Sequence, residues 1–167
     1  MGLRDAAASV PAKPIIAVVL GVTFLAAGWN GWTVYSFCTQ RGALSSSLQV
    51  WADKAIAGFG TEFKLETATD FEWDQVRISQ KVANPGTGQN CPFGLHWNNE
   101  KRAQMARAGE LTLFGFLNKD RLVEIVDFDR AWADFETDGE AISREEARFV
   151  NVPGTLTLRR ANPSPGQ

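Results

Sequence analysis

An uncharged stretch from Pro14 to Phe37 separates a short polar N-terminus from the rest of the chain. At a rise of about 1.5 Å per residue, a helix over this stretch crosses about 30 Å of hydrocarbon. Its second part carries three aromatic residues of the kind found at membrane interfaces, namely Trp29, Trp32 and Tyr35. The pattern predicts a transmembrane signal anchor at 14–37, preceded by a cytoplasmic N-terminus at 1–13.

A cleaved signal peptide is the alternative interpretation of the same stretch. The uniformly apolar part ends at Gly28, and LAAG at 25–28 resembles a small-residue cleavage site. Cleavage there would give a secreted protein. Arg4 and Lys13 precede the stretch, which favours a cytoplasmic N-terminus under the positive-inside rule. We therefore expect a single-pass protein of the cell membrane with residues 38–160 on the extracytoplasmic side.

The pattern after the anchor changes between helical and alternating periods. Apolar residues at helical spacing predict an amphipathic helix at 43–59 and a shorter helix at 100–108. Two apolar runs flank the turn triplet Asn118-Lys119-Asp120, which predicts a β-hairpin over 111–128. Further strands are expected at 71–78, 148–152 and 155–159. This order predicts an α+β domain, an antiparallel sheet with one packed helix, preceded by the N-terminal transmembrane or signal-anchor helix.

Residues 71–78, FEWDQVRI, alternate large apolar residues with charged ones, but the phase slips once between Trp73 and Val76. A β-bulge near Asp74 would return the apolar side chains to one face. Glu72 and Asp74 would then share the opposite face. Because an antiparallel sheet commonly has one solvated face, this pair is better explained as an outer surface than as catalytic carboxylates.

The remaining segments are rich in turn-forming or polar residues. A loop is expected at 84–99, a polar loop at 129–142, and a flexible tail at 161–167. Ser143 and Glu146 fit a capping box that starts one helical turn.

Three segments together resemble a known group of proteins: FEWDQVRI (71–78), LTLFGFLNKDRLVEIVDFDR (111–130) and ISREEARFV (142–150). They are similar to a family of small, largely uncharacterised bacterial exported or membrane-anchored proteins. Its members carry an FDWD-type strand, a hydrophobic hairpin and a late SREEA(K/R)F segment. The resemblance covers about residues 60–152 and implies the same architecture and an envelope location. The family brings no established activity, so the resemblance implies no catalytic residue.

Charge and motifs narrow the possible functions. The formal net charge is -2, with both signs interspersed, which argues against a nucleic-acid binder. No phosphate-binding loop, CxxC or HExxH motif is present, and no cofactor is predicted. His96, the only histidine, lies five residues after Cys91, but a metal site would need further ligands that are not evident nearby.

The two cysteines, Cys38 and Cys91, both follow the anchor. In an oxidising compartment they are expected to form a disulfide, and two free thiols are the alternative.

An acidic segment invites comparison with a calcium-binding loop. Four acids occupy positions 1, 3, 5 and 12 of an EF-hand pattern, namely Asp134, Glu136, Asp138 and Glu145, with Gly139 at position 6. Position 3 is glutamate and position 8 is Ala141, and the preceding residues form a strand pattern where a helix is needed. A solvated acidic loop is therefore favoured, with calcium binding as a weak alternative.

Three large apolar residues lie in the predicted loop at 84–99: Phe93, Leu95 and Trp97. They either cover the domain or form the binding site of a protein partner in the envelope. The anchor, the aromatic content and the lack of a catalytic set favour a membrane-anchored, non-enzymatic protein-binding or complex-stabilising module. The alternatives are an envelope hydrolase that uses carboxylates such as Asp127 and Asp129, and a small-ligand or calcium-binding module.

Overall fold

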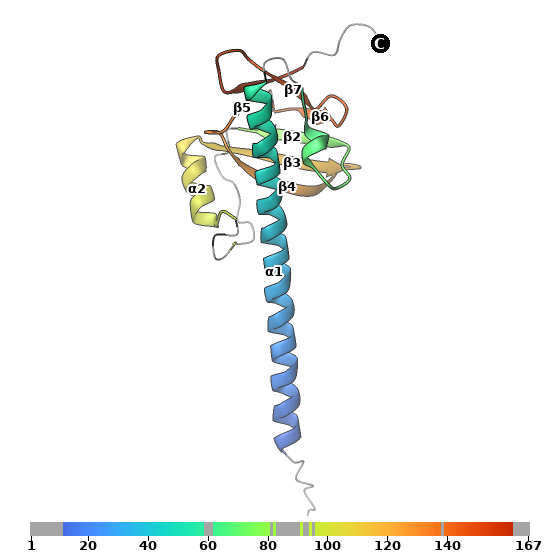
Figure 1. Ribbon diagram of the computed structural model, residues 1–167. Coiled ribbons are helices and arrows are strands. Elements are labelled where there is room, and N and C mark those ends of the chain that lie inside the picture. The colour runs from blue at the N-terminus through green and yellow to red at the C-terminus, as the bar shows by residue number, and fades with distance from the viewer. Residues whose placement is uncertain are drawn as a thin grey trace, which may run out of the picture.

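The computed structural model describes residues 12–58, 62–80, 82, 91, 94, 96–137 and 139–161, with only the backbone for 12–27. Helix α1 (Ala12–Ala57) runs unbroken into the domain, and the described strands pack against its C-terminal part (Figure 1). The other described elements are the 3-10 helix η1 (Leu65–Ala68), α2 (Asn99–Ala108) and eight strands: β1 (Phe63–Lys64), β2 (Gln75–Ser79), β3 (Leu111–Asn118), β4 (Arg121–Asp129), β5 (Asp134–Glu136), β6 (Ala141–Ser143), β7 (Arg148–Asn151) and β8 (Thr157–Arg160).

The domain is α+β, as the sequence predicts, but it has two sheets. One sheet has the order β4-β3-β2-β6 and is antiparallel throughout, and the other has the order β1-β7-β8-β5. In the second sheet β5 pairs parallel to β8. The prediction of a polar loop at 129–142 is wrong, because this segment contains β5 and the first part of β6. These strands have three residues each, too few to produce an alternating pattern in the sequence.

The predicted hairpin is confirmed as β3 and β4. Lys119 and Asp120 in its two-residue turn have φ values of 52° and 61°, as hairpin turns of the left-handed type require. A β-bulge lies in this hairpin, since Phe116 pairs with Glu124 and Leu117 with Leu122. The extra residue between these partners is Val123.

The predicted bulge near Asp74 is wrong, because strand β2 begins only at Gln75 and pairs regularly with β3. The phase slip in FEWDQVRI arises because Phe71 to Asp74 precede the strand. Trp73 is buried there, and its ring contacts Phe116 edge to face. Asp74 accepts a hydrogen bond from the Lys119 N–H (2.8 Å), so its carboxylate stabilises the hairpin turn. Glu72 is exposed, so the two carboxylates form no common site.

Edge-to-face aromatic contacts join the two sheets. Among the described residues six phenylalanines are fully buried, namely Phe63, Phe114, Phe116, Phe128, Phe135 and Phe149. Phe135 of β5 contacts Phe114 and Phe128 of the other sheet, with ring centroids 5.0 and 5.6 Å away. It also contacts Phe149 of its own sheet at 5.2 Å. The sequence places Phe135 in an acidic segment, and the structure places it at the centre of the core.

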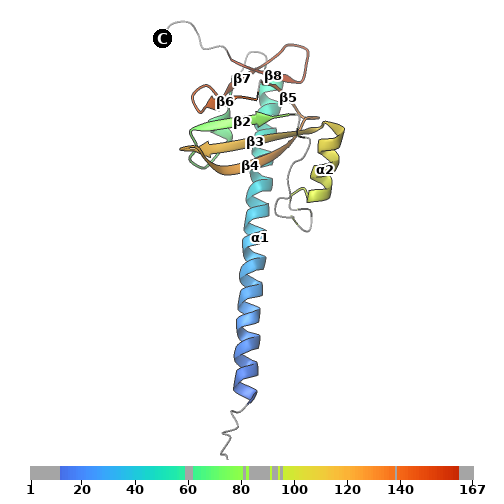
Figure 2. The ribbon, with the colours of Figure 1, turned by 180° about the vertical axis from the view of Figure 1, so that it is seen from behind.

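Helix α1 crosses the strands and closes the core from one side (Figures 1 and 2). Its buried apolar residues in this part follow helical spacing: Leu44, Leu48, Ala52 and Ala55. The predicted helix at 43–59 is therefore the last part of α1, which ends at Ala57. The predicted short helix is confirmed as α2, where Asn98 caps the N-terminus and Gly109, with φ of 69°, ends the helix.

The N-terminal part of α1 projects away from the domain (Figures 1 and 2). Three aromatic side chains stand exposed on it: Trp29, Trp32 and Tyr35. A search of the described residues found no helix with the length and apolarity needed to cross a membrane. Residues 1–11 and the tail at 162–167 lie outside the described residues.

We expect Phe135→Ala to lower the free energy of unfolding by about 3–5 kcal/mol, because it leaves a cavity between the sheets. Urea denaturation of the full chain in detergent, followed by circular dichroism, measures this change. Phe71→Ala is the matched control, since Phe71 is only partly buried and has one aromatic neighbour, Phe116. Equal losses in both variants would contradict a central role for Phe135.

Candidate functional site: a groove between the two helices

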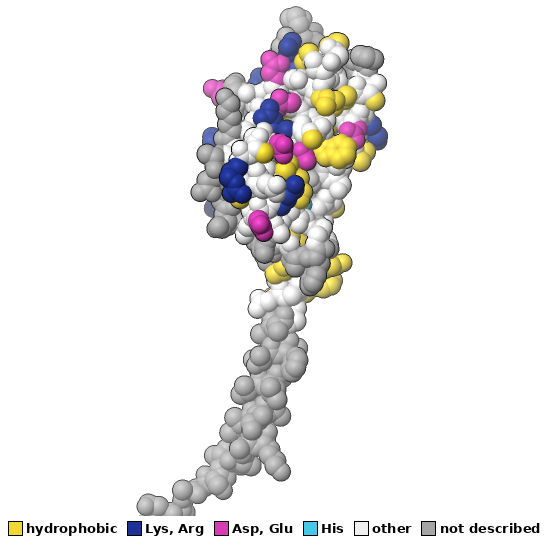
Figure 3. Space-filling model, turned by 90° about the vertical axis from the view of Figure 1, so that its left-hand side faces the viewer, with side chains coloured by type: hydrophobic (Ala, Val, Ile, Leu, Met, Phe, Trp, Pro, Cys, Tyr) yellow, Lys and Arg dark blue, Asp and Glu magenta, His cyan; other side chains and the backbone are white. Residues whose placement is uncertain are grey.

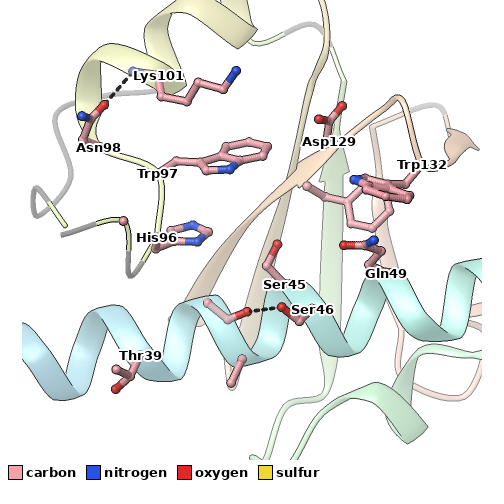
Figure 4. A pocket seen from close by; sticks show the side chains of 14 residues that line it. Thr39, Ser45, Ser46, Gln49, His96, Trp97, Asn98, Lys101, Asp129 and Trp132 are labelled. Carbon is pink, nitrogen blue, oxygen red and sulfur yellow. Dashed lines mark hydrogen bonds between the residues drawn. The ribbon is translucent and has the colours of Figure 1, made fainter. Parts of the chain in front are cut away.

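A groove of about 610 Å³ lies between α1 and the segment that leads into α2 (Figure 4). We call it the α1–α2 groove. Its floor is the 39–49 part of α1, one wall is formed by residues of 94–101, and the other by Phe128, Asp129 and Trp132 at the end of β4. The volume falls in the range of about 300–1,000 Å³ that is usual for small-molecule sites.

The floor of the groove consists of small and polar residues, namely Thr39, Gly42, Ala43, Ser45, Ser46 and Gln49. Their small side chains leave space beside the helix. Ser46 donates a hydrogen bond to the Gly42 carbonyl (2.9 Å), and Ser45 donates one to the Asp127 carbonyl (2.9 Å). The Ser45 contact also fastens α1 to the edge strand β4.

Two indole rings face the hollow from opposite walls (Figure 4). Trp97 reaches into the groove from the α2 side, where its ring stacks on His96 with centroids 5.9 Å apart and planes 5° from parallel. Trp132 lies across the groove beside Gln49, and 45% of its surface is exposed. Lys101 and Asp129 bring one charge of each sign to the groove lining. The groove therefore offers two aromatic faces and a polar floor.

A buried ionic cluster holds the α2 wall in place. The side chain of Asp127 leaves β4 on the face opposite Val126 and Phe128, and it is 0% exposed beside Arg41, His96 and Arg102. Its Oδ1 accepts a hydrogen bond from Arg102 Nε at 2.9 Å, and its Oδ2 lies 3.0 Å from His96 Nε2 and 3.5 Å from Arg41 Nη2. We call these four residues the Asp127 cluster. It joins β4 to α1, to α2 and to the segment between them.

The electrostatics of the cluster follow from burial and pairing. Burial alone would raise the pKa of Asp127, but the hydrogen bond with His96 and the charges of Arg41 and Arg102 hold this pKa below its usual value. Burial lowers the pKa of the Arg41 guanidinium; Asp127 opposes this effect and Arg102 adds to it. Asp127 is therefore ionised at neutral pH and paired with two guanidinium groups.

The predicted disulfide lies beside the cluster. Cys38 and Cys91 are bonded, with their Cα atoms 5.6 Å apart, and both are buried. Cys38 precedes Arg41 by about one helical turn. The disulfide therefore fastens the segment before His96 to the same part of α1 that Arg41 occupies.

The remaining predicted site residues are only partly brought together. Phe93 and Leu95 lie outside the described residues, and Trp97 is half-buried in the groove wall. Two of the calcium candidates, Asp134 and Glu136, lie on strand β5. Asp134 forms an ion pair with Arg130 (2.8 Å), and Glu136 forms one with Arg159 (2.7 Å). Asp138 lies outside the described residues, and Glu145 is exposed in a turn. The described part of the chain contains no group of three or more acidic, histidine or cysteine residues placed to hold a metal ion.

Comparisons of the chain with protein-family models, curated proteins and solved structures found no match.

We expect Asp127→Asn to lower the free energy of unfolding at pH 7 by about 3–5 kcal/mol, because it removes the buried carboxylate that pairs with both Arg41 and Arg102. The pKa of Asp127 is depressed in the folded state, so its contribution is full above the unfolded value of about 3.9. This stabilising contribution is lost as the pH falls from about 3.9 through the lower pKa that Asp127 has in the folded state. Urea denaturation at neutral and acid pH should show the difference between wild type and variant narrowing on acidification.

Asp129→Asn is the matched control, since it removes a partly exposed carboxylate two residues away on the same strand. It should change stability far less. A difference between wild type and Asp127→Asn that persists unchanged in acid would contradict the proposed ionic role.

We also expect the double variant Cys38→Ala/Cys91→Ala to be less stable by about 4 kcal/mol, the chain-entropy value for a loop of this length. The cysteines are 53 residues apart, so the bond strongly restricts the unfolded chain. Unfolding curves with and without reductant provide the measurement. The wild type should lose stability in reductant and the double variant should not. A wild type that is insensitive to reductant would rule out the bond.

Proposed function

We propose that this protein is a membrane-tethered, non-enzymatic binding module whose α1–α2 groove receives an extracytoplasmic ligand. One observation carries the proposal: a single helix contains both the uncharged stretch and the floor of the groove. The groove floor spans 39–49, and the same helix continues without interruption to the apolar stretch 14–37. Trp29, Trp32 and Tyr35 are exposed in the part of that stretch nearest the domain, where interfacial aromatic residues are expected.

The length of the helix supports the tether. From Ala12 to Phe37, just before the buried Cys38, α1 rises by about 39 Å. This exceeds the hydrocarbon thickness of about 30 Å. A disulfide is also compatible with an oxidising compartment on the extracytoplasmic side.

The positions of the carboxylates support binding without catalysis. Glycoside hydrolysis by the common mechanism needs two carboxyl groups on either side of the bond. Asp127 is buried and paired within its cluster, which leaves Asp129 as the one carboxylate among the described residues that line the groove. Asp129 accepts a hydrogen bond from the Ala131 N–H (2.8 Å). His96 directs its Nε2 toward Asp127, and this contact holds the imidazole ring in place beside the groove.

The proposal changes the predicted role of Trp97. The sequence suggested that Phe93, Leu95 and Trp97 form a patch for a protein partner. In the structure the indole of Trp97 is a wall of the groove, stacked on His96 (Figure 4). We therefore assign Trp97 to the binding of a ligand inside the groove, in place of a protein partner that covers an exposed loop.

The tether and its orientation are testable in intact bacterial cells that express the full chain. We expect the protein to stay in the membrane after alkaline carbonate washing. A membrane-impermeant maleimide should label Thr155→Cys, in an exposed turn, in intact cells. It should label the matched Asp5→Cys variant only after permeabilisation.

Release of the protein by carbonate, or the reverse labelling pattern, would overturn the tether. A mature N-terminus at Gly28 or Trp29, found by mass spectrometry, would instead support secretion after signal cleavage.

A further inference from the structure

We infer that the α1–α2 groove binds an uncharged glycan, with its sugar rings against the indoles of Trp97 and Trp132. This inference rests on the proposal that the groove is the ligand site, and it adds the chemical class of the ligand.

The aromatic walls suit the flat faces of sugar rings. The face of an indole carries negative electrostatic potential, which attracts the weakly positive C–H groups on the face of a pyranose. Trp132 keeps 45% of its surface exposed beside the groove, and Trp97 projects into it from the other wall (Figure 4). A ligand with both apolar faces and polar edges would use both walls.

The polar groups of the groove suit the edges of such a ring. Sugar hydroxyls both donate and accept hydrogen bonds, so they are best satisfied by groups of mixed character. The amide of Gln49 offers both a donor and an acceptor, Asp129 offers acceptors, and Lys101 offers donors. Since Lys101 and Asp129 cancel in charge, the groove favours a neutral ligand over an anion or a cation.

The described side chains on the face that carries α2 include charges of both signs. Basic, acidic and apolar side chains lie interspersed on the face that carries this helix (Figure 3). Charge therefore does not attract a phosphate-rich or strongly basic ligand to this face.

Peptides fit the groove less well. An extended peptide binds by adding a strand to an open sheet edge, but here Ser45 already occupies the Asp127 carbonyl on the edge strand β4. An amphipathic helix needs an apolar groove, whereas the floor of this one is formed largely by hydroxyl, amide and small side chains.

The side chains of the α2 wall are already ordered in the protein without a ligand. His96 is fixed by Asp127, and the Trp97 ring is stacked on His96. A ring that is already ordered loses little conformational entropy when a ligand binds, which favours affinity.

The test uses the full chain in detergent micelles, labelled with ¹⁵N. Six tryptophans give six indole N–H signals, which single Trp→Phe variants assign. Three neutral tetrasaccharides serve as probes at millimolar concentration: cellotetraose, maltotetraose and the β-1,4-linked tetramer of N-acetylglucosamine. We expect at least one of them to shift the Trp97 and Trp132 signals saturably, and to leave those of Trp29, Trp51 and Trp73 in place.

Trp132→Ala should weaken this binding by about tenfold, the loss expected for one aromatic contact. Its exposure means that the fold should survive, and the unchanged Trp73 signal would verify this. Trp32→Ala is the matched control, because Trp32 is also exposed on the chain but lies outside the groove. It should leave the affinity unchanged.

Three results would overturn the inference: no saturable shift with any of the three probes, shifts centred on Trp51 or Trp73, or undiminished affinity in Trp132→Ala. These results would leave the tether and its orientation standing, since carbonate washing and labelling measure those separately. Cleavage of a probe, seen as new anomeric proton signals in the same sample, would support glycan recognition but overturn a non-enzymatic function.

Discussion

The buried carboxylate of Asp127 is the interaction on which the site depends. Removing a charged group from water is costly, and it is tolerated here because three partners reach the same carboxylate from α1, α2 and the segment before α2. Arg41 and Arg102 are buried as well, so pairing with Asp127 also offsets the cost of removing their charges from water. The position of His96, and through it the ring of Trp97, follows from this one contact.

The disulfide supports the same junction by a different physical route. The ionic cluster acts in the folded state, through charge pairing in a dry environment. The Cys38–Cys91 bond acts largely on the unfolded chain, whose freedom it restricts across 53 residues. The disulfide and the ionic cluster reach α1 within one helical turn, at Cys38 and Arg41. If one of them is lost, the other still joins α1 to the segment that contains Cys91 and His96. Such doubling is useful where a segment rich in Gly, Pro and Asn must form one wall of a binding site.

Local patterns predicted the local parts of this fold. The hairpin, α2 and the buried face of α1 all have periodic sequences, and compartment chemistry was enough to suggest the disulfide. The Asp127 cluster left no such pattern, because its partners lie 25 and 31 residues or more from Asp127 and an arginine in a helix resembles any surface arginine. Phe135 was missed for a related reason. Its strand has only three residues and lies among acidic residues, so the sequence resembles a loop until the pairing with β8 is known.

The unbroken course of α1 has a mechanical consequence. A domain joined to its anchor by a flexible linker would sample many orientations, whereas a domain built on the anchor helix moves with it as a rigid lever. In the proposed tether, a tilt of about 20°, common for membrane helices, would displace the groove sideways by about 13 Å over an arm of about 39 Å. Interfacial residues that set such tilts, among them Trp29, Trp32 and Tyr35, would then determine the height and direction at which the groove meets its ligand.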